Sequence, residues 1–179
     1  MLYRLARARY ANLSGIGAAL QPGRWNVAGE EAIYTSTEIA VPVLERLVHT
    51  PKDMIPSNLA MMTLQIAGEW GEAAEVEGGG ILLNHRAGAC LMIYKTLRQS
   101  FAAAERRPLG SSRLRDHALM REYGPPLAVA VPSVIVPAWN VILYPQGRGF
   151  WDHVKLISVE PFAFDPRLFP ENAATEPIA

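Results

Sequence analysis

Three side chains with complementary chemistry stand close together in the first third of the chain. Arg24 lies in the loop sequence "GRWN", Tyr34 follows in "EAIYTS", and Glu45 follows in "VLERLVH". A guanidinium pairs with anions, a phenol offers an aromatic face and a hydroxyl, and a carboxylate stabilises positive charge. The three could form a catalytic pocket. The plainer alternative is a salt bridge between Arg24 and Glu45 that fixes a loop to a helix, with Tyr34 in the core.

A short strand and an amphipathic helix are expected to position these groups. "EAIYTS" has the β-branched and aromatic composition of a strand, and Ser36 or Thr37 can cap the helix that follows it. Apolar residues recur there at three- and four-residue steps and predict a buried stripe: Ala40, Val43, Leu44, Leu47 and Val48. Glu45 borders this stripe beside Val41 and His49, so its carboxylate is expected at the edge of the core.

The remaining segments predict an α+β fold with a mixed, mainly antiparallel sheet and flanking helices. Strand-like composition recurs in "LYRL", "NLAMMTLQIAGEW", "LAVAVPSVIV", "WNVILYP" and "VKLISVEPFAF". The connection from residue 8 to residue 26 is expected to be mostly loop, and residues 72–88 are expected to be irregular because they are rich in glycine. Helical spacing predicts a helix over residues 89–107, and residues 109–126 suit a loop and a short helix.

Composition and failed motifs exclude several function classes. The chain has 179 residues with 17 basic and 17 acidic side chains, so no net charge attracts nucleic acid or a membrane surface. The arginines of "ERRPLGSSRLRDH" could contact phosphates, but a solvated surface is the better interpretation. P-loop, dinucleotide-fingerprint, nucleophile-elbow and metal-ligand spacings are all missing. The sequence has a single cysteine, which fits a reducing compartment, and we recognise no signal peptide or membrane span in it. We therefore expect a soluble, cytoplasmic protein.

The order and spacing of these residues resemble those of RES-domain proteins, a family named for arginine, glutamate and serine. Arg24, Tyr34 and Glu45 are followed by "VPSVIVPAWNVILYP", which supplies Ser133 and Asn140, and by "PFAFDPRLF" near the end. The resemblance covers residues 1–76 and 124–169. Residues 77–123 depart from it, because they lack the Gly-Trp turn and the helix that similar proteins have there. One domain is expected over residues 1–169, with residues 170–179 as a disordered tail.

The resemblance implies a fold like that of ADP-ribosyltransferases and the role of a toxin in a bacterial toxin–antitoxin pair. Such proteins consume NAD as a substrate, without a separate cofactor or metal, by hydrolysis or phosphorolysis of the bond to nicotinamide. A minority transfer ADP-ribose to a protein. The implied partner is an Xre-type helix-turn-helix antitoxin that occludes the active site, with the toxin as a homodimer within the complex. A non-catalytic antitoxin-binding module is a third interpretation.

The resemblance also implies a role for each matched residue. Glu45 would stabilise the oxocarbenium-like state and hold a ribose hydroxyl, and Arg24 would pair with the pyrophosphate. Tyr34 would stack on nicotinamide, while Ser133 and Asn140 would complete the binding set. The bland alternatives are a core tyrosine and a buried serine that satisfies the backbone. Trp25 and Trp139 are expected to be packing residues, and for Asn26 and Asn140 the alternative is an amide that braces a turn or loop.

Overall fold

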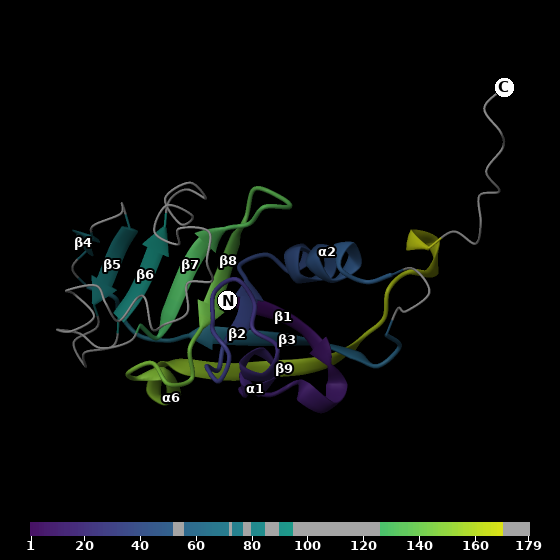
Figure 1. Cartoon of the computed structure of the whole chain (residues 1–179), viewed down its shortest axis with the longest axis horizontal. Helices are drawn as coiled ribbons and strands as arrows, with labels where there is room; N and C mark the ends of the chain where they lie inside the picture. Colours follow the sequence, from purple (N-terminus) through teal and green to yellow (C-terminus); the bar gives the residue numbers. More distant parts are fainter. Residues whose placement is uncertain (52–55, 72, 77–79, 85–89, 95–125, 170–179) are drawn as a thin grey trace, which may run out of the picture.

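The computed structural model describes residues 1–51, 56–71, 73–76, 80–84, 90–94 and 126–169. Within these residues, nine strands form one sheet in the order β4-β5-β6-β7-β8-β2-β1-β3-β9 (Figure 1). The strands are β1 (Leu2–Arg7), β2 (Ile33–Ser36), β3 (Leu59–Ile66), β4 (Ala73–Val76), β5 (Gly80–Asn84), β6 (Cys90–Tyr94), β7 (Ala128–Pro132), β8 (Trp139–Leu143) and β9 (Val154–Phe162). Every neighbouring pair is antiparallel except β6 and β7, which run parallel. The prediction of a mainly antiparallel sheet is therefore confirmed.

Short helices accompany this sheet. They are α1 (Ile16–Leu20), α2 (Ala40–Val48) and α6 (Phe150–His153), with single 3-10 turns at Ala8–Tyr10 and Pro166–Leu168. Helix α2 packs on β1 and β2, and α6 packs on β9 (Figure 1). In the described ranges, no helix is long and apolar enough to cross a membrane. The connection between β1 and β2 is mostly loop, as expected, but it also contains α1.

The hydrophobic core lies along the middle of the sheet. Ile33 of β2, Met62 and Leu64 of β3 and Leu143 of β8 are fully buried, at 0% exposure. Strands β8 and β2 are neighbours in the sheet order, and β3 follows with only β1 between it and β2, although the residues of these strands are far apart in the chain. Burial of such aliphatic side chains stabilises the domain by about 1.5–3 kcal/mol each. The core thus fixes the relative positions of β2 and β8, from which the site residues project.

The start of α2 differs from the prediction. The helix begins at Ala40, and its N-cap residue, Ile39, makes no side-chain cap hydrogen bond. The expected cap hydroxyls accept no N–H from within the helix: Ser36 Oγ accepts from the Glu38 N–H at 3.5 Å, before the helix begins, and both Ser36 Oγ and Thr37 Oγ1 donate to the Trp139 carbonyl, at 2.8 Å and 3.4 Å. The bonds to the Trp139 carbonyl fasten the end of β2 to β8, and the helix begins only at Ala40.

The buried stripe of α2 is also rotated from its expected position. Val41 is the buried residue of the helix, whereas the stripe members Leu44 and Val48 are 36% and 66% exposed. Glu45 follows Val41 by four residues, so the two side chains share a face of the helix. Glu45 is consequently turned further toward the sheet than a residue at the edge of the stripe would be.

Two predictions in the middle of the chain are wrong. Residues 73–76 and 80–84 form β4 and β5 rather than irregular structure, and Cys90–Tyr94 forms β6 rather than the start of a helix. A run of five apolar residues fits either periodicity, and pairing with β5 and β7 decides for the strand. The predictions for residues 95–125 and 170–179 lie outside the described residues.

Candidate active site

One cavity collects side chains from elements that are far apart in the sequence. Its volume is about 310 Å³, and its wall comes from the loop before β2, from β2, α2 and β8, and from the β7–β8 connection. Four of the predicted site residues line it: Arg24, Tyr34, Glu45 and Asn140. The guanidinium, the phenol and the carboxylate that the sequence singled out therefore share one cavity.

Glu45 is held from across the cavity by an amide. The Asn140 Nδ2 donates to Glu45 Oε1 at 2.6 Å. The register of the sheet explains this meeting, because Ser36 at the end of β2 pairs with Asn140 of β8, and α2 begins four residues later. Within the part of the chain that the structure describes, no ion pair joins Arg24 to Glu45. The salt-bridge alternative is therefore not what holds the loop to the helix.

The loop around Arg24 is fastened to the phenol of Tyr34. The Trp25 backbone N–H donates to Tyr34 Oη at 3.1 Å, and Tyr34 Oη donates to Asn26 Oδ1 at 2.9 Å. Burial raises the pKa of Tyr34 to about 12, and the nearby Glu30 carboxylate adds to the rise, while the Trp25 hydrogen bond and Arg24 oppose it. The phenol is therefore neutral at physiological pH and acts as a hydrogen-bond donor.

Arg24 itself is exposed, whereas the two residues after it are buried. Trp25 is 6% exposed and Asn26 is 0% exposed, so the loop is anchored by these side chains. The buried Tyr144 hydroxyl donates to the Trp25 carbonyl at 2.7 Å. Trp25 packs as predicted and also lines the cavity, while Trp139 is half-buried against the core. The guanidinium thus reaches the rim of the cavity from a fixed backbone.

Ser133 stands apart from the other predicted residues. It follows the last residue of β7 and is 8% exposed, but the cavity wall is made by its neighbours Pro132 and Val134. Its Oγ accepts from the Ile135 N–H at 3.2 Å, and its own N–H donates to the Ala138 carbonyl at 2.8 Å. These contacts brace the turn between β7 and β8, and a role for Ser133 in binding stays a prediction.

Sequence reasoning assigned no site role to several residues of the wall. His49 lines the cavity from the C-terminal end of α2, four residues after Glu45, and this spacing on one helix was the signal that could have found it. The apolar part of the wall comes from the β7–β8 region: Val131, Pro132, Val134 and Ile135. No sequence pattern distinguishes these residues from ordinary strand residues. Among the described residues, no group of three or more His, Cys, Asp or Glu could hold a metal ion.

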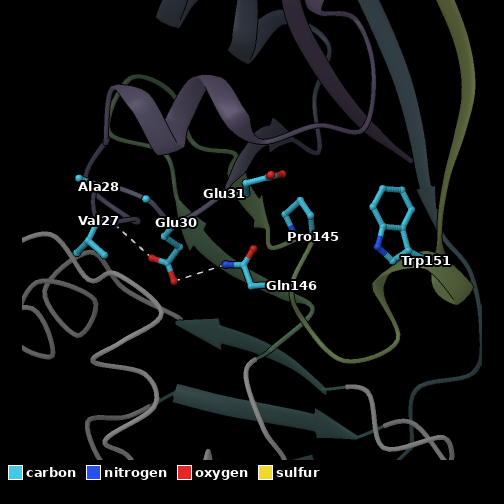
Figure 2. A pocket seen from close by; sticks show the side chains of 8 residues that line it. Val27, Ala28, Glu30, Glu31, Pro145, Gln146 and Trp151 are labelled. Carbon is cyan, nitrogen blue, oxygen red and sulfur yellow. Dashed lines mark hydrogen bonds between the residues drawn. The ribbon is translucent and has the colours of Figure 1, made fainter.

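A second, larger cavity of about 550 Å³ lies beside residues 27–31 of the same loop, and Figure 2 shows its lining. Glu30 is buried there, where its Oε2 accepts from the Val27 N–H at 3.2 Å and its Oε1 accepts from Gln146 Nε2 at 3.5 Å. Its described lining has two carboxylates, Glu30 and Glu31, and no basic side chain. The smaller cavity has the guanidinium of Arg24 on its wall, so it is the better candidate for a phosphate-bearing substrate.

Fold and site together define an α+β domain whose cavity, lined by polar and apolar side chains, lies between one helix and the sheet. The family model for the RES domain matches residues 1–165. A protein of Yersinia enterocolitica named Toxin Res is 31% identical, and the alignment covers 94% of this chain and 99% of that protein. Toxin Res of Photorhabdus laumondii is 28% identical over 94% of this chain and 96% of its own length. The chain belongs to the RES domain family and is a RES-domain toxin.

Two further similarities bear on activity and fold. A Sphingobium protein named Prs ADP-ribosylating toxin is 26% identical, and the alignment covers 88% of this chain and 86% of that protein. A chain in the crystal structure of the M. tuberculosis MbcT–MbcA toxin–antitoxin complex superposes with a TM-score of 0.55 at 14% identity. That superposition covers 94% of this chain and 85% of the other, and it shows that the two share a fold.

Proposed function

We propose that this chain is the toxin of a toxin–antitoxin pair and arrests growth by degrading NAD at the bond between nicotinamide and ribose. The observation that carries the proposal is the convergence of Arg24, Tyr34 and Glu45 on one cavity, with Glu45 held by Asn140. Membership in the RES domain family supports the same conclusion.

The reaction needs a group that stabilises positive charge on the ribose. As the nicotinamide nitrogen leaves C1′ with the bonding electrons, charge builds on the sugar in an oxocarbenium-like state. A fixed carboxylate beside the ribose stabilises that state, and Glu45 is the candidate because the bond from Asn140 fixes one of its oxygens. Water then forms the new bond at C1′ and loses a proton, which gives ADP-ribose and neutral nicotinamide. Phosphate as the acceptor gives ADP-ribose 1″-phosphate instead.

The size and polarity of the cavity suit the nicotinamide end of the dinucleotide. A volume of about 310 Å³ is at the lower end of the range of about 300–1,000 Å³ for small-molecule sites. We therefore place nicotinamide and its ribose inside, with the Tyr34 ring against nicotinamide. The pyrophosphate would lie at the rim, where the exposed guanidinium of Arg24 can pair with it through two parallel hydrogen bonds. Because side chains grip the dinucleotide, no glycine-rich fingerprint is required.

Incubation of the purified protein with NAD tests this proposal. Chromatography of the reaction is expected to show nicotinamide and ADP-ribose in equal amounts, with the phosphorylated product when phosphate is present. A protein that binds its antitoxin but releases no nicotinamide under either condition would contradict the proposal. That result would favour the non-catalytic binding module.

Transfer of ADP-ribose to a protein is the second candidate function. The name of the Sphingobium relative favours it, because that protein is called an ADP-ribosylating toxin. The same cavity would then deliver ADP-ribose to a side chain of the target instead of water or phosphate. NAD labelled in its adenine ring separates the two functions, because transfer leaves the label on a protein band and hydrolysis leaves it in free ADP-ribose.

An Xre-type helix-turn-helix antitoxin is the proposed partner. The fold match to a chain of a toxin–antitoxin complex supports it, as do exposed apolar side chains near the cavity. Val134 on the cavity wall is 58% exposed, and Ile39 and Val48 at the two ends of α2 are 53% and 66% exposed. We expect a neighbouring gene to encode such a helix-turn-helix protein, and we expect addition of that protein to stop nicotinamide release. A homodimer within the complex and a cytoplasmic location remain predictions.

A further inference from the structure

The buried amide of Asn26 is bonded at every donor and acceptor position. Its Oδ1 accepts from the Gly23 N–H at 2.9 Å and from Tyr34 Oη at 2.9 Å. Its Nδ2 donates to the Ala18 carbonyl at 2.8 Å and to the Glu30 carbonyl at 3.0 Å. Nδ2 also donates to the Val27 carbonyl at 3.2 Å. An asparagine side chain offers two lone pairs and two N–H groups, so these bonds use it completely. A single side chain at 0% exposure therefore ties α1, the loop and β2 together.

The bonds of this network lie on both sides of Arg24. The Gly23 N–H before it is held by Asn26, and the Trp25 N–H after it is held by Tyr34. The Trp25 carbonyl is held in turn by Tyr144. The residues on either side of Arg24 are thus fixed through their backbones, which restricts the position of the Arg24 Cα and therefore the space that its side chain can reach.

Close packing adds to the hydrogen bonds. A Cβ atom at Gly23 would stand 2.5 Å from the Tyr34 hydroxyl oxygen and 2.9 Å from the ring carbon that bears it. The loop therefore lies directly on the phenol, and only glycine fits there. By contrast, the Tyr34 hydroxyl has both of its hydrogen bonds within the loop, to Trp25 and Asn26, so its bonding capacity is directed to the loop and not to the cavity.

We propose that Asn26 is a positioning residue, which together with the Tyr34 hydroxyl clasps the loop and holds Arg24 where it can bind the pyrophosphate of NAD. This inference rests on the proposed function and assigns a task to a residue outside the cavity wall. It also divides Tyr34 into two parts: the ring faces the substrate, and the hydroxyl holds the loop.

Hydrogen exchange of backbone amides tests the clasp without any activity measurement. The Gly23 and Trp25 amides donate to side-chain acceptors, so removal of an acceptor opens them to solvent. We expect Tyr34→Phe to speed exchange at Trp25 and Asn26→Ser to speed exchange at Gly23. Exchange in β3 should stay as in the wild type, which also shows that the variants are folded. Unchanged exchange at both amides would overturn the clasp.

A double-mutant cycle on the NAD dissociation constant tests the link to Arg24. We expect Tyr34→Phe or Asn26→Ser to weaken NAD binding on the order of tenfold, and to have no further effect once Arg24→Ala is present. Asn12→Ser is the matched control, because Asn12 also accepts a backbone N–H, from Ser14, in the same connection but does not line the cavity. Equal losses with and without Arg24 would mean a merely structural role and would overturn the inference.

The two arms separate failure of this inference from failure of the proposed function. If the wild-type protein binds no NAD, the proposed function fails, and the positioning role fails with it. In that case the exchange arm still decides whether the clasp exists. If Asn26→Ser does not fold, Tyr34→Phe alone can be used for both the hydrogen-exchange experiment and the double-mutant cycle, because it removes one hydroxyl and keeps the ring.

Discussion

Asn140 and Glu45 are 95 residues apart in the chain, yet the Asn140 Nδ2 donates to Glu45 Oε1 at 2.6 Å. The pairing of β2 with β8 brings them together, since Ser36 lies opposite Asn140 in the register and α2 begins just after Ser36. The sheet thus places the carboxylate, and the amide fixes its orientation. This relationship makes Glu45 the centre of the proposed chemistry.

Asn140→Ala should slow NAD cleavage more than it weakens NAD binding. The substitution removes the donor that orients Glu45, and a hydrogen bond to a charged group is worth about 1.5–3 kcal/mol, which corresponds to a fall in kcat of roughly ten- to a hundredfold. Steady-state kinetics of nicotinamide release measure kcat and KM separately. A variant with wild-type kcat would show that the orientation of Glu45 does not depend on Asn140.

Arg24→Lys should weaken NAD binding although it keeps the positive charge. A lysine lacks the planar fork that pairs with two phosphate oxygens, so we expect KM to rise roughly tenfold or more with a smaller change in kcat. Arg9→Lys is the control, because Arg9 lies over the Tyr10 ring on the surface and is not part of the cavity wall. Equal KM values for Arg24→Lys and wild type would contradict the proposal that Arg24 binds the pyrophosphate of NAD through its planar guanidinium.

Gly23→Ala should destabilise the protein, whereas Gly17→Ala should not. A Cβ at Gly23 meets the Tyr34 hydroxyl oxygen at 2.5 Å, while a Cβ at Gly17 in α1 meets nothing within 4 Å. Overpacking of this kind costs about 1–3 kcal/mol, and an alanine in a helix is favoured over glycine by about 0.5–1 kcal/mol. Urea denaturation of the two variants measures the free energies of unfolding. Equal free energies of unfolding for Gly23→Ala and Gly17→Ala would show that the loop at Gly23 does not pack against the Tyr34 phenol.

The raised pKa of Tyr34 predicts a loss of stability at high pH. Burial raises the folded-state pKa to about 12 from its ordinary value of 10.0, so the folded protein holds this proton more tightly than the unfolded chain. The stabilisation is complete below pH 10 and is lost as the pH rises through about 12. Urea denaturation between pH 8 and pH 11 should show a steeper decline for wild type than for Tyr34→Phe. Parallel curves would mean that Tyr34 titrates normally, and Tyr10→Phe, at an exposed position, serves as the control.

The sequence was most informative where periodicity and tertiary packing agree. Strands such as Leu59–Ile66 and Val154–Phe162 were predicted from composition, and the sheet contains them. Cys90–Tyr94 was assigned to a helix because five apolar residues carry no clear period, and partner strands decided its structure. The predicted cap of α2 is wrong because Ser36 and Thr37 lie at the end of β2, where their hydroxyls donate to the Trp139 carbonyl of β8, and the helix begins only at Ala40.

The site was predictable to the extent that it follows a spacing motif. Arg24, Tyr34, Glu45 and Asn140 were selected from the sequence, and all four line one cavity. The sequence predicts for Asn26 only a loop-bracing role, because it does not show that the bonds of this side chain converge from α1, the loop and β2. The long-range contacts of a buried polar side chain depend on the finished fold.

Nicotinamide release by the purified Glu45→Gln variant tests the central claim most directly. Glutamine keeps an oxygen for the bond from Asn140 and removes only the charge, so the variant should fold and bind NAD. Glu38→Gln, an exposed residue just before α2, is the control. We predict that Glu45→Gln loses nicotinamide release by roughly a hundredfold or more while Glu38→Gln retains it. Release by Glu45→Gln at the wild-type rate would contradict the account.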